Sequence, residues 1–502
     1  MSSTDPSRAP RARNALFCLS VSAALGACAV GPDFHAPAPP GTEHYTQGAQ
    51  PQSTAEAPGA AGGAQTFVVD RDIPADWWTL FQSQPLDALV KASLRDSPTV
   101  ESAKAALRSA QENYVAERGA LFLPGADGSF SGTRQKSPGA AFGAPQFGAS
   151  TYTLVTAAVN VSYRLDVFGA SRRQLEALGA QRDYQHWELE AANLSLTGNV
   201  VTTAINVASL RAQITAVKDI VASEQDQLNI VQRQFSAGGA SRADVLAQST
   251  QLAQTEATLP ALEKALAQAQ HRLAVLSGKT PDSETPDFDL EKLSLPVELP
   301  VSVPAKLIRQ RPDVQAAEAQ LHQASANVGV ATANLFPQID LKGSIGSDAL
   351  SAGGLFGSGT GAWSAGASLT APIFHGGELI HKRRAALADL DNAFAQYRQT
   401  VLAAMQDVAD TLRALEADAR DLRAQANAED LAGKSLDITK KQFAAGGVSN
   451  VQLLVAERAY AQAHQTRVVA EAARYADSAA LYQALGGGWW NRKDEQDKVE
   501  KQ

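Results

Sequence analysis

The chain of 502 residues has little cysteine, few aromatic side chains and no excess of positive charge. Its two cysteines, Cys18 and Cys28, lie within the first thirty residues, which argues against a disulfide framework and against a cysteine-based zinc or iron–sulfur site. The formal net charge of −8 argues against a nucleic-acid-binding protein, because such proteins carry basic patches that meet phosphates. Beyond the N-terminal leader we find no apolar run of about 18 residues, so we expect no membrane-spanning helix.

Signals of catalysis are lacking as well. No Ser, His and Asp set stands in a recognisable local context, and no glycine-rich loop joins a strand to a helix as a phosphate-binding loop does. His375 and His381 are six residues apart, which does not fit the i,i+4 spacing of metal ligands on a helix. We therefore expect no catalytic residue, no metal and no cofactor, and an enzyme is the least favoured class.

The N-terminus is typical of an exported bacterial lipoprotein. Three arginines precede an apolar run at residues 15–25, which is too short to span a bilayer as a helix. The run ends at residues 25–28 (LGAC), where small residues come directly before a cysteine. This predicts a signal peptide at 1–27 and a covalent lipid, diacylglycerol and N-acyl, on Cys28. The alternative is an ordinary signal peptide that happens to contain a cysteine.

The rest of the chain is predicted to contain two copies of one sequence repeat. Ordered matches recur at a separation of about 206 to 214 residues, which indicates an internal duplication: residues 123–124 (LP) with 336–337 (FP), 167–169 (VFG) with 373–376 (IFHG), and 234–239 (QFSAGG) with 442–447 (QFAAGG). We expect these domains in order: signal peptide 1–27, acylated tether and extended segment 28–84, first repeat 85–280, linker 281–303, second repeat 304–490, and charged tail 491–502.

Each copy contains a long helical hairpin. Proline-free stretches rich in good helix formers cover residues 169–236 and 377–444, and the Ala-Gly-Gly that follows each is a helix stop. Return helices are expected at about 241–277 and 449–485. Pro260 lies inside the first return helix and should kink or break it.

Alternating apolar and polar residues predict strands at 151–165, 338–345 and 361–373, with a weaker one at 124–134. The pattern fits a half-buried sheet in a soluble protein, or a membrane barrel with apolar residues outward and a polar lumen. Together with the lipoprotein signal it favours the barrel.

Closure of that barrel predicts the fold class. Four strands cannot enclose an open lumen, and open sheet edges are not tolerated in lipid. Three chains would supply twelve strands. We therefore expect a mixed α-helical and transmembrane-β protein with an internal two-fold sequence repeat. Its homotrimer would form a 12-stranded β-barrel, four strands per chain, continued by a long α-helical barrel.

Several motifs together resemble the outer membrane efflux proteins of the TolC-like outer membrane factor family, and within it the lipoproteins that serve resistance–nodulation–division pumps. The motifs are residues 28–34 (CAVGPDF), 77–78 (WW), 309–314 (RQRPDV), 333–337 (ANLFP), 372–374 (PIF) and 485–489 (LGGGW). The resemblance implies a trimeric channel-tunnel in the outer membrane of a Gram-negative bacterium, lipid-anchored and extending into the periplasm. It would passively conduct drugs, toxic compounds or metal ions to the outside, from an inner-membrane resistance–nodulation–division pump and a periplasmic membrane-fusion adaptor.

The resemblance also suggests a gate. In the family the periplasmic tip closes where the long hairpins turn, and matching along the turn places Val451 at an apolar ring position. Gln452 and Val455 fall where relatives often carry Asp, so the acidic ring is missing and a mainly hydrophobic constriction is expected. Coiled-coil packing is the alternative for Val451, Leu453, Leu454 and Val455.

The hairpin turns are the expected contacts with the adaptor, with helix capping as the alternative for their glycines. Arg242 and Asp244 are expected either to pair across the tip or to remain solvated surface charges. The complete set of expected tip residues is Gly238, Gly239, Arg242, Asp244, Gly446 and Gly447.

Two other functions remain open from the sequence. A periplasmic coiled-coil lipoprotein that acts as a spacer without a pore explains the helices and Cys28, but not amphipathic strands at equivalent positions in both copies. An outer-membrane channel for protein export is the other, and the resemblance leans against it. Conductance in a planar bilayer would distinguish a channel from a spacer.

Overall fold

The computed structural model describes residues 29–42, 44–48, 51–138, 140, 143, 146 and 148–492. The predicted signal peptide, Cys28 and residues 493–502 of the predicted tail lie outside the described residues. The chain divides into two compact units, and each unit draws on both halves of the sequence. Unit 1 comprises Leu107–Gln185, Ala317–Tyr397 and the described residues up to Pro37. Unit 2 comprises Ala38–Ala106, His186–Ala316 and the described residues from Arg398 to Arg492.

Two helices of 67 residues are the longest elements, α4 (Ala170–Ser236) and α9 (Glu378–Ala444). They confirm the helical segments that were predicted at 169–236 and 377–444. One 18-residue window in α4 is apolar enough to cross a bilayer by composition, which corrects the expectation that no such run follows the leader. In this window 67% of the residues are buried inside the protein, so its apolar side chains serve packing.

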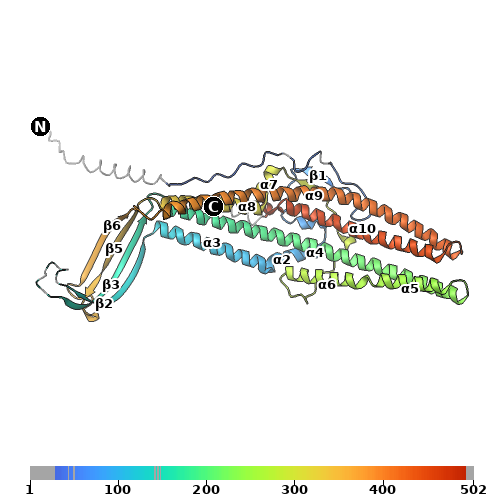
Figure 1. Cartoon of the computed structure of the whole chain (residues 1–502), viewed down its shortest axis with the longest axis horizontal. Helices are drawn as coiled ribbons and strands as arrows, with labels where there is room; N and C mark the ends of the chain where they lie inside the picture. Colours follow the sequence, from blue (N-terminus) through green and yellow to red (C-terminus); the bar gives the residue numbers. More distant parts are fainter. Residues whose placement is uncertain are drawn as a thin grey trace, which may run out of the picture. The chain divides into compact units, whose positions relative to one another are not determined.

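The return helices differ between the two halves because of one proline. In the first half, two residues separate α5 (Arg242–Glu256) from α6 (Leu259–Leu276), and Pro260 lies in the first turn of α6. The predicted break is therefore confirmed, since proline lacks the N–H that a continuous helix needs. In the second half, α10 (Asn450–Ala484) is unbroken. Helices α5 and α10 contact each other in unit 2 (Figure 1).

Shorter elements complete the fold. They are β1 (Thr66–Val69), η1 (Trp77–Phe81), α2 (Gln84–Asp96), α3 (Pro98–Phe122), η3 (Leu290–Lys292), β4 (Glu298–Val301), α7 (Pro304–Gln310), α8 (Pro312–Ala333), η4 (Ala352–Gly354) and η5 (Trp489–Asn491). Strands β1 and β4 form a two-stranded parallel sheet. The expected linker at 281–303 therefore pairs with the extended segment near the N-terminus.

Unit 1 contains a four-stranded antiparallel sheet in the order β2–β3–β5–β6 (Figure 1). Its strands are β2 (Gly125–Ser137), β3 (Ser150–Leu165), β5 (Gln338–Ala349) and β6 (Gly361–Thr370). All four predicted strands are confirmed. Strand β5 is longer than predicted because its last residues still pair with β3, where Thr156 Oγ1 donates to Asp348 Oδ1 at 2.6 Å. Strand β6 ends at Thr370, before Pro372.

The core of unit 2 combines aromatic stacking with one buried arginine. The ring of Trp77 stacks on that of Tyr482 with centroids 5.4 Å apart. Arg474 on α10 is fully buried and donates to the carbonyl oxygen of Ala61, to Thr54 Oγ1 and to Gln65 Oε1 at 2.8–3.1 Å. A buried charge needs such partners, so this part of the expected tether is fixed against α10.

We expect two glycine-to-alanine variants to change stability in opposite directions. Gly486, just after α10, has φ +95°, and an added Cβ would lie 2.3 Å from the carbonyl oxygen of Gln310. Gly486→Ala should destabilise the fold by about 2 kcal/mol or more. Gly119 in α3 has open space around it, so Gly119→Ala should stabilise by about 0.5–1 kcal/mol. Thermal unfolding followed by circular dichroism in detergent measures both, and equal effects would contradict the prediction.

Candidate functional site

The sheet of unit 1 has one apolar face. The register places Val159 opposite Ile345 and Ile345 opposite Trp363, so one row of large apolar side chains crosses three strands. Trp363 is 79% exposed, and Val159 and Ile345 are exposed too. Leu341 and Leu369 continue the same face. An exposed apolar face of this kind is suited to contact hydrocarbon rather than water.

The opposite face of the sheet is polar and hydrogen-bonded. Arg164 Nε donates to Asp340 Oδ1 at 3.0 Å across the β3–β5 pair. Asn160 donates to Ser129 Oγ at 3.0 Å, and the hydroxyls of Ser344 and Ser364 lie 2.8 Å apart. The two faces together have the character of a wall between lipid and a polar lumen.

The edges of this sheet are open. Strands β2 and β6 are the outermost strands, and within the described part of the chain no further strand pairs with either of them. A bilayer does not tolerate unpaired backbone groups at a sheet edge. Within the described sheet, β2 and β6 therefore each have one side without a paired strand.

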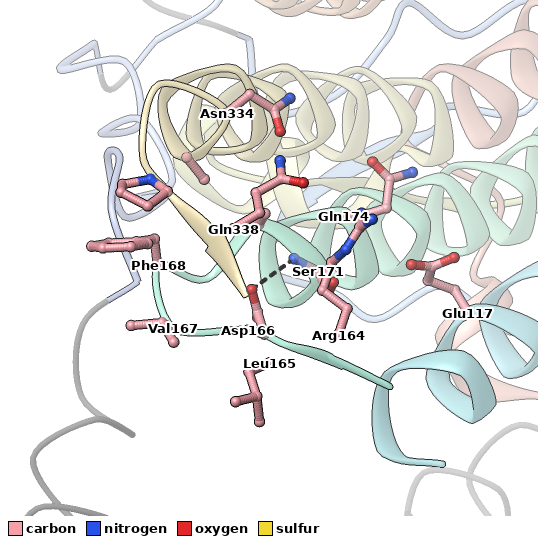
Figure 2. A pocket seen from close by; sticks show the side chains of 13 residues that line it. Glu117, Arg164, Leu165, Asp166, Val167, Phe168, Ser171, Gln174, Asn334 and Gln338 are labelled. Carbon is pink, nitrogen blue, oxygen red and sulfur yellow. Dashed lines mark hydrogen bonds between the residues drawn. The ribbon is translucent and has the colours of Figure 1, made fainter. Parts of the chain in front are cut away.

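The junction between the sheet and the helices is held by polar contacts around a cavity of about 200 Å³ (Figure 2). Asp166 follows β3 and accepts from the backbone N–H groups of Ser171 and Arg172 at 3.1 and 2.9 Å, which caps the start of α4. Behind it, the rings of Phe168 and Phe336 stack with centroids 4.8 Å apart. The junction connects β3 to α4, and its residues form no recognisable catalytic arrangement.

The hairpin tips are closed by glycine caps and capping boxes. Gly238 and Gly446 have φ +80° and +75°, and the next N–H in each turn donates back into the long helix. The following helices begin with reciprocal bonds between Ser241 and Asp244, and between Ser449 and Gln452. The bonds from Ser241 lower the pKa of Asp244.

The predicted tip residues have these contacts. Asp244 is engaged by Ser241 rather than by Arg242, which is exposed. Gln452 is exposed, and its side-chain oxygen accepts from the Ser449 N–H at 3.0 Å. The turn glycines Gly238, Gly239, Gly446 and Gly447 cap the long helices, and none of them lies within a packed core.

Two valines of the predicted constriction lie on one exposed strip of α10. Val451 and Val455 are one helical turn apart and are 61% and 62% exposed. Leu453 and Leu454 between them are buried, and Leu453 packs in a cluster with Leu436. The coiled-coil packing of this segment therefore uses Leu453 and Leu454 and leaves the two valines on the surface of the chain.

A buried polar layer between the hairpins was not predicted. Gln251 on α5 donates to Glu224 Oε1 on α4 at 3.0 Å, and Gln248 lies 3.5 Å from Glu457 Oε2 on α10. All four side chains are buried, and within the described residues Glu224 Oε2 and Glu457 Oε1 have no hydrogen-bond partner. Burial raises the pKa of Glu457, and the nearby Glu224 adds to the shift. The sequence signal that could have indicated this layer was the presence of glutamine and glutamate on the packed faces of the long helices.

Two motifs with a family resemblance have structural contacts. Arg311 donates hydrogen bonds to both carboxylate oxygens of Asp313 at 3.0 and 2.6 Å. It also donates to Asp407 on α9 at 2.9 Å. Near the N-terminus, Arg173 on α4 donates to Asp33 Oδ1 at 2.7 Å and to Glu176 Oε2 at 2.7 Å. Both arginines are largely buried and fix where chain segments meet.

Within the described ranges, no cluster of three or more His, Cys, Asp or Glu side chains is placed to hold a metal ion. The predicted lipid site, Cys28, precedes the first described residue.

The chain is similar to known proteins in sequence and in structure. A family profile described as "Outer membrane efflux protein" matches residues 89–279 and 303–487. The chain is 30% identical over 421 residues to the pyoverdine export outer membrane protein OpmQ of Pseudomonas aeruginosa, covering 82% of this chain and 87% of that protein. It is 29% identical over 469 residues to nodulation protein T of Rhizobium leguminosarum bv. viciae, covering 93% and 92%. Among solved structures, the outer-membrane channel OprN is similar with a TM-score of 0.81 and 27% identity, over 92% of this chain and 100% of that one.

The buried layer predicts a pH-dependent stability. Because the pKa of Glu457 is raised in the folded state, the unfolded chain loses its proton first as pH rises, and stability falls through that window. Glu457→Gln should remove this cost. We expect a melting temperature higher by about 2 °C at pH 8, which corresponds to about 1 kcal/mol, and little change at pH 4.

The control for this prediction is Glu263→Gln, since Glu263 on α6 is exposed. It should leave the melting temperature unchanged at both pH values. Equal behaviour of the two variants at pH 8 would show that Glu457 carries no burial cost.

Proposed function

The chain belongs to the outer membrane efflux protein family and is the outer-membrane channel of an efflux system, and we propose that three copies of it assemble into one passive conduit. The observation that carries the proposal is the sheet of unit 1, which has an apolar face, a polar face and two open edges. Four strands cannot enclose a lumen, whereas three chains supply twelve strands and leave no edge.

A repeated order of elements supports the same architecture, as an internal duplication would produce. The element order helix, two strands, 67-residue helix and return helix occurs twice, as α3–β2–β3–α4–α5–α6 and α8–β5–β6–α9–α10. We infer that each half of the chain contributes one strand pair to the membrane barrel and one long hairpin to a helical barrel. The helical hairpins of three copies then form the wall below the membrane.

The partners follow from the family. We infer a periplasmic membrane-fusion adaptor at the hairpin tips, with Gly238, Gly239, Gly446 and Gly447 as close-approach positions and Arg242 and Asp244 beside them. The other partner is an inner-membrane resistance–nodulation–division pump, which supplies the energy. The cargo is a class of small molecules, because the similar protein OpmQ is named for pyoverdine export. No catalytic residue or bound cofactor takes part.

A lipid on Cys28 is proposed to anchor each copy in the outer membrane. The docking of the neighbouring segment supports this role, since Val30 N–H donates to the Phe168 carbonyl at 3.1 Å and Asp33 pairs with Arg173. Phe34 stacks on His322 with centroids 4.3 Å apart. The segment that follows Cys28 is thereby held close to the last residues of β3.

The constriction is proposed to be a hydrophobic ring. Val451 and Val455 lie on the exposed strip of α10, while Gln452 beside them is occupied in the helix cap. A narrow apolar ring closes a pore by excluding water rather than by binding ions. Six valines from three copies form the ring in this proposal.

Single-channel conductance in a planar bilayer tests the function. The purified trimer should conduct, and a helical spacer should not. Native mass spectrometry of the same sample gives the copy number. A protein that is stable as an isolated monomer would refute the proposal.

The gate assignment predicts a leaky variant. Replacing both valines, Val451→Ser and Val455→Ser, should raise the resting conductance by roughly tenfold, the factor that corresponds to about 1.4 kcal/mol of barrier. Val469→Ser is the matched control, because Val469 is exposed on the same helix four turns from Val455. A double variant that conducts like the wild type would remove these residues from the gate.

The lipid assignment predicts the behaviour of Cys28→Ser. This variant should lose the mass of the acyl chains and should no longer be labelled by radioactive palmitate, because the thiol is the acceptor. The docked segment at residues 30–34 should preserve trimer assembly. Palmitate labelling that persists in the variant would show that the lipid lies elsewhere.

A further inference from the structure

Three carboxamide side chains meet at the junction cavity without bonding to the rest of the protein. They are Gln174 on α4, Asn334 directly after α8 and Gln338 at the start of β5, and all three line the cavity of about 200 Å³ (Figure 2). Each is half-buried, and among the residues that the structure describes none of the three amide groups has a hydrogen-bond partner. Half-buried polar groups without internal partners bind water or a ligand.

The charged groups at this cavity disfavour an anionic ligand. Arg164 Nε donates to Asp340 Oδ1 at 3.0 Å. Asp166 accepts from the backbone N–H groups that open α4 and from Arg172 Nε at 3.1 Å. The lining therefore carries the carboxylates of Asp166 and Glu117 against the one guanidinium of Arg164, and that guanidinium is already paired. Neutral hydrogen-bonding groups meet no such repulsion.

A second cavity, of about 430 Å³, adjoins the first one. Asn334 and Gln338 line both cavities, so their amides lie at the boundary that the two share. The second cavity adds the hydroxyl of Thr370, which is opposite Gln338 in the register of β5 and β6. Two adjoining cavities with amide groups between them suit an extended chain better than a single compact molecule.

The amide cluster lies on the polar face of the sheet. Side chains alternate along a strand, so Gln338 projects to the same face as Asp340, the partner of Arg164. In the conduit proposed above this face lines the lumen. Three copies then place three such clusters around the path of the cargo, at the level where the sheet meets the helices.

The chemistry of the amides indicates the ligand. A carboxamide presents N–H donors and a C=O acceptor together, and hydroxyl and amide groups match both. We propose that Gln174, Asn334 and Gln338 form a lumenal binding site for neutral chains that carry hydroxyl and amide groups. The assignment rests on the conduit proposed above and names a class of cargo for it. Binding at this site is weak, because cargo that passes must also leave.

Interruption of single-channel current tests the site in the full-length protein. We expect tetra-N-acetylchitotetraose, which carries both hydroxyls and amides, to block the open channel for measurable times. Polyethylene glycol of equal mass only accepts hydrogen bonds and should block for shorter times. End-blocked tetraalanine offers amides without hydroxyls, so it distinguishes a peptide from a saccharide as the source of this chemistry.

Two variants remove the amides and retain the size of the side chain. Gln174→Met and Gln338→Met should each shorten the blockade by tetra-N-acetylchitotetraose about three- to tenfold, the factor that corresponds to one lost hydrogen bond. They lie on different elements, so each tests the site independently of the other. Gln232→Met is the matched control, because Gln232 is an exposed glutamine on the same helix as Gln174, and it should behave like the wild type.

The outcomes separate this site from the conduit. A conducting channel that the saccharide does not block longer than polyethylene glycol does, or that blocks equally in the wild type and both methionine variants, overturns the site and leaves the conduit standing. A protein that does not conduct at all contradicts the conduit.

Saturation-transfer NMR of the detergent-solubilised protein with tetra-N-acetylchitotetraose measures binding without conductance. Transfer to the saccharide that weakens in Gln174→Met and Gln338→Met, but not in Gln232→Met, supports the site. No transfer, or transfer that is equal in all the variants, overturns it.

Discussion

A backbone N–H or C=O that enters hydrocarbon without a partner costs several kcal/mol, and the architecture proposed for this protein depends on that cost. Within the described sheet, β3 and β5 are paired on both sides, whereas β2 and β6 are paired on one side only. The two faces already suit lipid and water. The edges do not, so the fold of one chain is complete at the centre of its sheet and incomplete at its borders.

The helical part of the chain is organised by buried polar contacts in addition to apolar packing. Arg474 ties the N-terminal segment to α10, and Arg311 ties the start of α8 to α9. Glu224 and Glu457 lie in a layer of amides between the hairpins. Such contacts add less stability than apolar residues of the same volume, but they determine which segments meet.

The sequence predicts the elements well and their contacts less well. The 67-residue helices and the break at Pro260 follow from helix-forming composition, proline and glycine, which act locally. The length of β5 depends on pairing with a strand almost two hundred residues away. The polar layer around Glu457 depends on which face of each helix is packed. The sequence pattern alone does not reveal that face. Gln452 was expected only at the constriction, yet its side chain also caps its own helix.

The open edges of the sheet also bear on biogenesis. A strand edge is a template for any extended chain, so under the proposed trimer a newly exported copy is prone to aggregate until two others arrive. Meeting of three molecules depends steeply on local concentration, and confinement to a surface raises that concentration. Yield in a cell or an expression host should therefore follow the density of newly arrived chains at the membrane, in addition to the stability of the finished assembly.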